Sequence, residues 1–117
     1  MNITSLYGGC DTLFKSFLIF IIVDYISGLL KAIKYKKLNS DIGVNGIIKK
    51  FGYILIVVIA TSFDTLFNNN MMIRNSIIYM FIANEGISIL ENLSLIGVPI
   101  PNILKDKLDN LGGDNNK

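Results

Sequence analysis

Apolar residues are concentrated in three long runs along the chain, at about residues 13–33, 51–67 and 71–96. These runs are too long and too continuous for ordinary strands, and a helix built from the first would be roughly 31 Å long, close to the hydrocarbon thickness of a bilayer. The second run is near the short limit for a membrane span. Its helix could also extend back into GIIKK, residues 46–50, with Ser40 or Asp41 as its cap. The sequence NNN at residues 68–70 predicts a tight polar turn between the last two runs. The pattern therefore predicts three transmembrane helices, the last two forming a hairpin.

The segment after the third run has a different character. Residues 97–101, GVPIP, are expected to end the helix, because proline lacks a backbone donor and restricts the residue before it. Leucines then recur at helical spacing opposite lysine and aspartate, at Leu104, Leu108 and Leu111. This predicts a short amphipathic helix that lies on a surface or docks on protein. The expected fold is one all-α integral membrane domain over residues 1–117, with three transmembrane helices and this C-terminal helix.

Composition agrees with a membrane protein and argues against an enzyme. Hydrophobic residues make up 51% of the chain and charged residues only 17%, and the mean hydropathy is +0.52. There is no histidine and only one cysteine, which excludes Cys/His metal sites, a disulfide within the chain and Ser-His-Asp catalysis. We also find no glycine-rich phosphate loop. We therefore expect no catalysis, no cofactor and no nucleic-acid partner.

The lysines predict an orientation. Many of them lie in the connector at residues 34–50, which we expect to be a loop. By the positive-inside rule this loop is cytoplasmic, so the N-terminus is outside and the tail at residues 97–117 is cytoplasmic. The cluster either sets topology alone or also attracts anionic lipid headgroups. The topology-determining residues are Lys34, Lys36, Lys37, Lys49 and Lys50.

Each predicted hydrophobic helix carries a polar stripe. The weakest is that of the second helix, with Tyr53, Ala60, Thr61 and Asp64. The first stripe contains Asp24, and the third contains Glu85 within an arc of about 120°. A charge at mid-bilayer costs roughly 2.5 to 3.5 kcal/mol, so these groups must face protein or water, or become neutral. The candidate pore-lining or helix-contact residues are Asp24, Ser27, Gly28, Lys31, Asn84, Glu85, Ser88, Glu91 and Asn92.

Two interpretations of Asp24 remain open at this point. It could make a polar contact between helices, with Lys31 or with a serine or asparagine of a neighbour, or it could line an aqueous path. It would be neutral or paired in a closed assembly and ionised along an open one. Nearer the outer end, Asp64 and Arg74 are expected to form an ion pair across the hairpin, close enough to water for snorkelling.

Two stretches of the chain resemble a known family. DYISGLLKAIKYKKLNSDIGVNGIIKK, residues 24–50, contains D-Y-x-[ST]-G-x-x-K-A followed by K-x-[NS]-S-x-x-G-x-x-G-x-x-K-K. IANEGISILENLSLIGVPIPNILKDKL, residues 82–108, contains N-E-x-x-S-I-L-E-N followed by G-x-P-[IV]-P. Together these motifs resemble the toxin-secretion/phage-lysis holin family of low-GC Gram-positive bacteria and their phages.

This resemblance implies a function that the residues alone do not. Holins accumulate in the bacterial cytoplasmic membrane and assemble into lesions, through which an endolysin reaches the cell wall or a toxin leaves the cell. The implied partners are the lipid bilayer and further copies of the chain, with a functional link to an endolysin or toxin that requires no direct binding. The family has no enzymatic activity and no cofactor.

Two other classes of protein fit the same pattern. A small proton-coupled membrane transporter also uses a membrane carboxylate, although such chains usually have four tight spans and little tail. An accessory subunit of a membrane complex could be held to its partners by the polar stripes. Three spans of one small chain cannot enclose a wide pore, so any pore lined by these stripes needs several copies.

Overall fold

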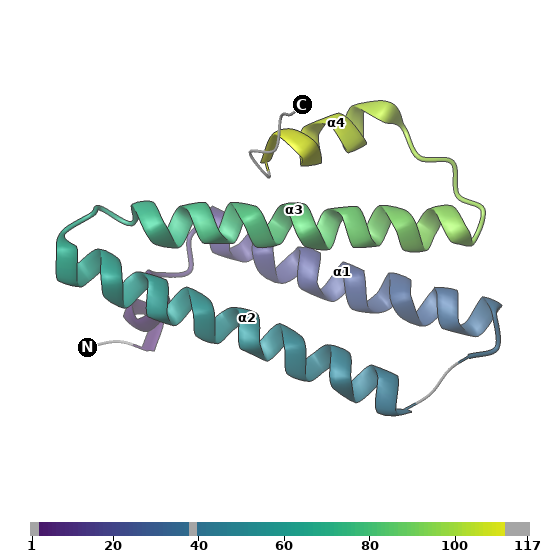
Figure 1. The fold of residues 1–117 in the computed structure, drawn as a ribbon, viewed down its shortest axis with the longest axis horizontal. Helices are drawn as coiled ribbons and strands as arrows, with labels where there is room; N and C mark the ends of the chain where they lie inside the picture. Colours follow the sequence, from purple (N-terminus) through teal and green to yellow (C-terminus); the bar gives the residue numbers. More distant parts are fainter. Residues whose placement is uncertain (1–2, 38–39, 112–117) are drawn as a thin grey trace.

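The computed structural model describes residues 3–37 and 40–111, and these ranges are entirely helical apart from turns and connectors. A 3-10 helix, η1 (Ile3–Tyr7), precedes four α-helices, and no strand occurs in the described ranges. The helices are α1 (Thr12–Lys34), α2 (Ser40–Phe67), α3 (Met72–Leu95) and α4 (Asn102–Leu111) (Figure 1). The prediction of an all-α fold with a short C-terminal helix is confirmed.

Local chemistry explains where these helices begin and end. Asp11 is the N-cap of α1, and its Oδ1 accepts a hydrogen bond from the backbone N–H of Phe14 at 2.9 Å. Asn68 and Asn70 have positive φ values of 57° and 55° and make the turn between α2 and α3. Gly97, with φ of 100°, ends α3, and the N–H of Val98 returns to the carbonyl of Leu93 at 3.0 Å.

Helix α3 is central to the bundle. It packs against both α1 and α2, which contact each other only sparsely, and α4 turns back along α3 on the side away from α2 (Figure 1). The apolar core lies between the three long helices and consists of Phe14, Phe17, Val57, Ile78 and Ile82. Stacked aromatic rings join η1 and α1 to this core, beginning with Tyr7 on Phe14 at 4.3 Å between ring centroids.

Polar side chains are buried while many large apolar side chains are exposed. Buried groups include Arg74, with no exposed surface, and Glu85, which is 4% exposed. By contrast, Leu55 on α2 is 64% exposed and Ile22 on α1 is 57% exposed. This distribution is the reverse of a water-soluble domain and suits a surface in contact with lipid.

Two helices in the described part of the chain are long and apolar enough to cross a membrane, Thr12–Lys34 and Gly43–Phe67. The third predicted span, 71–96, forms helix α3 but is not one of these two. Its charged and amide side chains lower its hydropathy. Length and composition thus support two membrane-crossing helices, and crossing by α3 remains a prediction.

Most of the expected loop at residues 34–50 is helical in the structure. Lys34 belongs to α1, residues 38–39 lie outside the described residues, and α2 begins at Ser40, well before the predicted start at residue 51. Lys49 and Lys50 therefore lie on a helix. The helix continues through these lysines because the Lys50 charge is compensated by carboxylates of the other two helices. The predicted tail at 97–117 contains α4, and residues 112–117 also lie outside the described residues.

Candidate functional site

Three charged side chains from three different helices meet inside the bundle. The Lys50 ammonium on α2 lies 2.7 Å from Oδ2 of Asp24 on α1 and 2.6 Å from Oε1 of Glu85 on α3. Asp24 is 9% exposed, Glu85 is 4% exposed, and the Lys50 side chain is 13% exposed. We call Asp24, Lys50 and Glu85 the charge cluster. Among the described residues, no other ion pairs connect charged side chains of all three long helices.

Amide and hydroxyl groups extend the cluster along α1 and α3. The Asn92 Nδ2 donates to Ser27 Oγ at 3.0 Å and approaches Asp24 Oδ1 at 3.5 Å. Ser27 in turn donates to the carbonyl of Asp24 at 3.0 Å. Among the described residues, every buried side-chain nitrogen and oxygen has a hydrogen-bond partner. The interior is thus polar but internally satisfied, which is the condition for tolerating buried charge.

The pairing of Asp24 with Lys31, one of the alternatives considered for it, is wrong. Asp24 pairs with Lys50 instead, whereas the alternative of a neighbouring serine or asparagine matches its approach to Asn92. Lys50 was predicted only as a topology-determining lysine and was missed as a member of the site. A signal was present, because Lys50 continues the helical stripe of Tyr53, Ala60, Thr61 and Asp64 by one turn.

The other candidate residues do not all join the cluster. Gly28, Lys31 and Ser88 line a cleft of about 760 Å³ between α1, the start of α2 and the end of α3, next to Asp24 and Lys50. Asn84 and Glu91 are exposed and lie at the edge of the predicted arc of α3, away from the charge cluster. Glu91 instead lines a second cavity, between α3 and α4.

A second polar centre lies at the end of the bundle where α3 begins. The buried Arg74 guanidinium donates to the carbonyls of Tyr7 and Gly9 at 2.9 and 3.0 Å and pairs with Asp11 at 2.9 Å. The expected Asp64–Arg74 side-chain ion pair is wrong, since Asp64 accepts the backbone N–H groups of Ile73 and Arg74 at the start of α3. Arg74 is also fully buried instead of snorkelling.

We call Arg74 and its partners in residues 7–11 the N-terminal anchor. The hydrogen bond from Arg74 lowers the pKa of the Asp11 carboxyl, and the bond from the Phe14 amide lowers it further. Gly8 fits tightly here, because a Cβ at this position would lie 2.7 Å from Arg74 Nε. Arg74 thus joins the segment before α1 to the start of α3.

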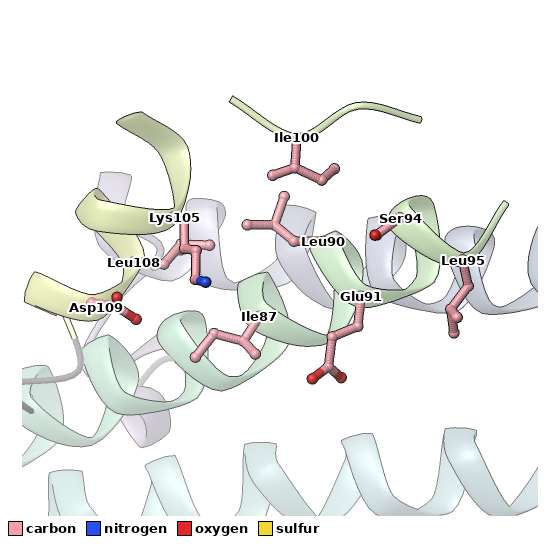
Figure 2. A pocket seen from close by; sticks show the side chains of 9 residues that line it. All are labelled: Ile87, Leu90, Glu91, Ser94, Leu95, Ile100, Lys105, Leu108 and Asp109. Atoms are coloured by element: carbon pink, nitrogen blue, oxygen red, sulfur yellow. The ribbon is translucent and has the colours of Figure 1, made fainter. Parts of the chain in front are cut away.

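Helix α4 covers part of α3. Leu108 is 8% exposed, and a Cβ at Gly86 would lie 3.1 Å from Leu108 Cγ, so the two helices approach closely only because residue 86 is glycine. A cavity of about 590 Å³ lies beside this contact (Figure 2). Figure 2 shows the side chains that line it, which are Ile87, Leu90, Glu91, Ser94, Leu95, Ile100, Lys105, Leu108 and Asp109.

The site offers no arrangement for metal binding in the described residues, where no group of three or more His, Cys, Asp or Glu side chains is found. The two buried carboxylates converge on an ammonium group, which takes the place that a cation would need. The chemistry available here is ion pairing between charges of three helices.

The sequence that builds this arrangement is similar to known proteins. The model of the bacteriophage holin family matches residues 1–113, which include the charge cluster, the N-terminal anchor and α4. The chain belongs to the bacteriophage holin family. No solved structure matches it.

Relatives of this holin-family protein occur in bacteria and a phage. An uncharacterized protein of Clostridium perfringens is 42% identical over 114 residues, which cover 97% of this chain and 84% of the relative. A probable holin of Bacillus phage phi105 is 38% identical over 100 residues, which cover 86% of this chain and 74% of the relative. An uncharacterized protein of Listeria monocytogenes is 40% identical over 101 residues, covering 86% of this chain and 72% of the relative.

Proposed function

We propose that this protein acts as a holin that oligomerises in the bacterial cytoplasmic membrane and forms lesions. The observation that carries the proposal, besides the family, is a charge cluster buried beneath an apolar exterior. One copy satisfies its charges internally and can accumulate in lipid without exposing them. An assembly that turns the same groups toward water would stabilise an aqueous path. No catalytic step is involved.

In the membrane we place α1, α2 and α3 across the bilayer, with the lysine-rich connector on the cytoplasmic side and the N-terminus outside. Helix α3 needs the other two helices for this, since its buried groups Arg74, Glu85 and Asn92 must be shielded from lipid. The bundle provides this shielding through the charge cluster and the N-terminal anchor.

This topology has a consequence for α4. Gly86 lies near the middle of α3, so a docked α4 would hold its charged residues deep in the bilayer, at roughly 2.5 to 3.5 kcal/mol each at the centre. The residues concerned are Lys105, Asp106, Lys107 and Asp109. We propose that α4 leaves α3 when α3 crosses the membrane, and that it then lies at the cytoplasmic surface with its leucines in the interface.

In the opening step, the ion pairs within one copy would break, and the charged groups would then contact water between copies. Separation of α2 from α1 and α3 withdraws Lys50 from both carboxylates, and hydration of the three charges then favours the open assembly. The membrane potential acts on charges within its field, at about 2.3 kcal/mol per charge per 100 mV, so its collapse would bias this step. The released cargo would be an endolysin, or alternatively a toxin.

The decisive experiment is induced expression of the protein with and without a co-expressed endolysin. We expect loss of membrane potential in both cultures and rapid lysis only where the endolysin is present. Asp24→Asn and Glu85→Gln should each change the time of potential loss, because each alters the charge balance around Lys50. Unchanged timing in both variants, at equal protein levels, would refute the role of the cluster.

Purified protein in vesicles separates this proposal from the alternatives. A lesion should release large labelled dextrans, whereas a proton-coupled transporter would move a small substrate without such release. Copurification with one fixed partner, together with no toxicity on expression alone, would indicate an accessory subunit instead.

A further inference from the structure

The cleft of about 760 Å³ beside the charge cluster opens at the lysine-rich end of the bundle. Residues from the end of α1, the start of α2 and the end of α3 line it, including Lys31, Lys37 and Tyr25. This end of the bundle is held together by two hydrogen bonds to the end of α3, from Tyr35 to the Leu95 carbonyl at 2.7 Å and from Lys34 to the Ile96 carbonyl at 3.3 Å. The ends of α1 and α3 that border the cleft are therefore joined to each other.

Two of the lysines that line this cleft have no counter-charge among the described residues. Lys50 is paired with two carboxylates, and Lys34 is hydrogen-bonded to a carbonyl. Lys31 and Lys37 make no hydrogen bond or ion pair with a described residue. Across residues 31–50 the sequence has six lysines and one aspartate, so the surroundings also favour an anion.

We propose that this cleft binds the anionic headgroup of a phospholipid, with Lys31 and Lys37 at its phosphate and the acyl chains along α1 and α2. The inference rests on the proposed function, because it requires the bundle to lie in a bilayer. A lipid bound here would lie next to the charge cluster, because Asp24 and Lys50 line the same cleft. Lipid composition would therefore affect the ion pairs of the cluster.

The walls of the cleft favour a lipid over a soluble anion. Leu29, Ala32 and Leu95 line it, together with Gly43 and Gly46, where the absence of side chains leaves room. The helix surfaces on either side of it are apolar and exposed, with Ile33 60% exposed on α1 and Val44 53% exposed on α2. Acyl chains would cover these surfaces, whereas inorganic phosphate would leave them bare.

The experiment is a titration of the full-length protein in neutral detergent, followed by native mass spectrometry, with phosphatidylglycerol and with phosphatidylcholine. We expect preferential retention of phosphatidylglycerol. Lys31→Gln together with Lys37→Gln should weaken it about fivefold for each lysine removed. The matched control, Lys105→Gln with Lys107→Gln on α4, makes the same charge change outside the cleft and should retain wild-type binding. Lys31→Arg with Lys37→Arg should restore binding and shows that loss is not misfolding.

Several results would overturn the site. The first is equal binding of phosphatidylglycerol and phosphatidylcholine. The second is a loss of lipid binding in the α4 control as large as that in the Lys31 and Lys37 variant. The third is complete competition by inorganic phosphate at equal concentration, which would indicate a site for a soluble anion. A different result would refute the holin proposal alone. In that case vesicles of either lipid would release no dextran, while the protein would still retain phosphatidylglycerol. Dextran release without any effect of the Lys31 and Lys37 substitutions on lipid binding would refute the lipid site alone.

Discussion

Replacing Lys50 with methionine tests the charge cluster most directly. The substitution keeps an unbranched side chain of similar length but removes the ammonium that lies 2.7 Å from Asp24 and 2.6 Å from Glu85. Two buried carboxylates would then lie near each other without a counter-charge. Breaking a buried ion pair by removing one partner costs about 3–5 kcal/mol. At tenfold per 1.4 kcal/mol, this raises the equilibrium constant for unfolding by roughly two to four orders of magnitude.

The assay is unfolding of the purified protein in detergent micelles, followed by far-ultraviolet circular dichroism against denaturant and temperature. Lys49→Met is the matched control, because Lys49 is the adjacent residue on the same helix and is exposed. We expect Lys50→Met to lower both midpoints strongly and Lys49→Met to change them little. Adding Asp24→Asn and Glu85→Gln to Lys50→Met should recover most of the loss, since no buried charge then remains.

Equal midpoints for Lys50→Met and Lys49→Met would refute the reasoning, because they would mean that Lys50 does not compensate a buried charge. Failure of the neutral triple variant to recover stability would also contradict it. In that case the loss would reflect packing of the lysine stem and not the pairing of its ammonium.

Three further predictions concern the N-terminal anchor and the contact of α4 with α3. Gly8→Ala should destabilise the protein by about 1–3 kcal/mol in the same unfolding assay, since φ at Gly8 is +85° and a Cβ would lie 2.5 Å from a methionine side chain. Asp11 stabilises the fold while ionised, and its pKa is lowered in the folded state, so this contribution should be lost as the pH falls below about 4. Asp11→Asn should remove that part of the acid dependence in a pH series of melts. A disulfide between cysteines at Gly86 and Leu108, in a Cys10→Ser background, should hold α4 on α3 and delay lysis until a reductant is added.

Each of these predictions has its own control. Gly9→Ala shares the positive φ of +95° but meets nothing within 4 Å, so it separates backbone strain from the clash expected at Gly8. Asp106→Asn on α4 makes the same chemical change as Asp11→Asn away from Arg74, and an equal effect would contradict the N-terminal anchor. The two single-cysteine variants control for the disulfide, and lysis on schedule with the crosslink formed would show that α4 need not leave α3.

The helical content, the turn at residues 68–70, the end of α3 before Gly97 and the amphipathic helix at the C-terminus could all be predicted from the sequence. These features depend on local properties, namely the length of apolar runs, the preference of asparagine and glycine for positive φ, and the exclusion of proline from helix interiors. Family membership could also be predicted, because the motifs that carry the resemblance are short and contiguous.

Which polar side chains contact each other depends on how the helices pack, and this could not be predicted from the sequence. Lys50 appeared to be part of a cytoplasmic loop, because a lysine pair normally interrupts a membrane span, and its burial is possible only through carboxylates 26 and 35 residues away on other helices. Arg74 likewise binds a segment more than 60 residues earlier in the chain. Helical periodicity places a residue on a face of its own helix but does not state which helix that face meets. Pairing across helices depends on their packing and register, and these fixed the charge cluster.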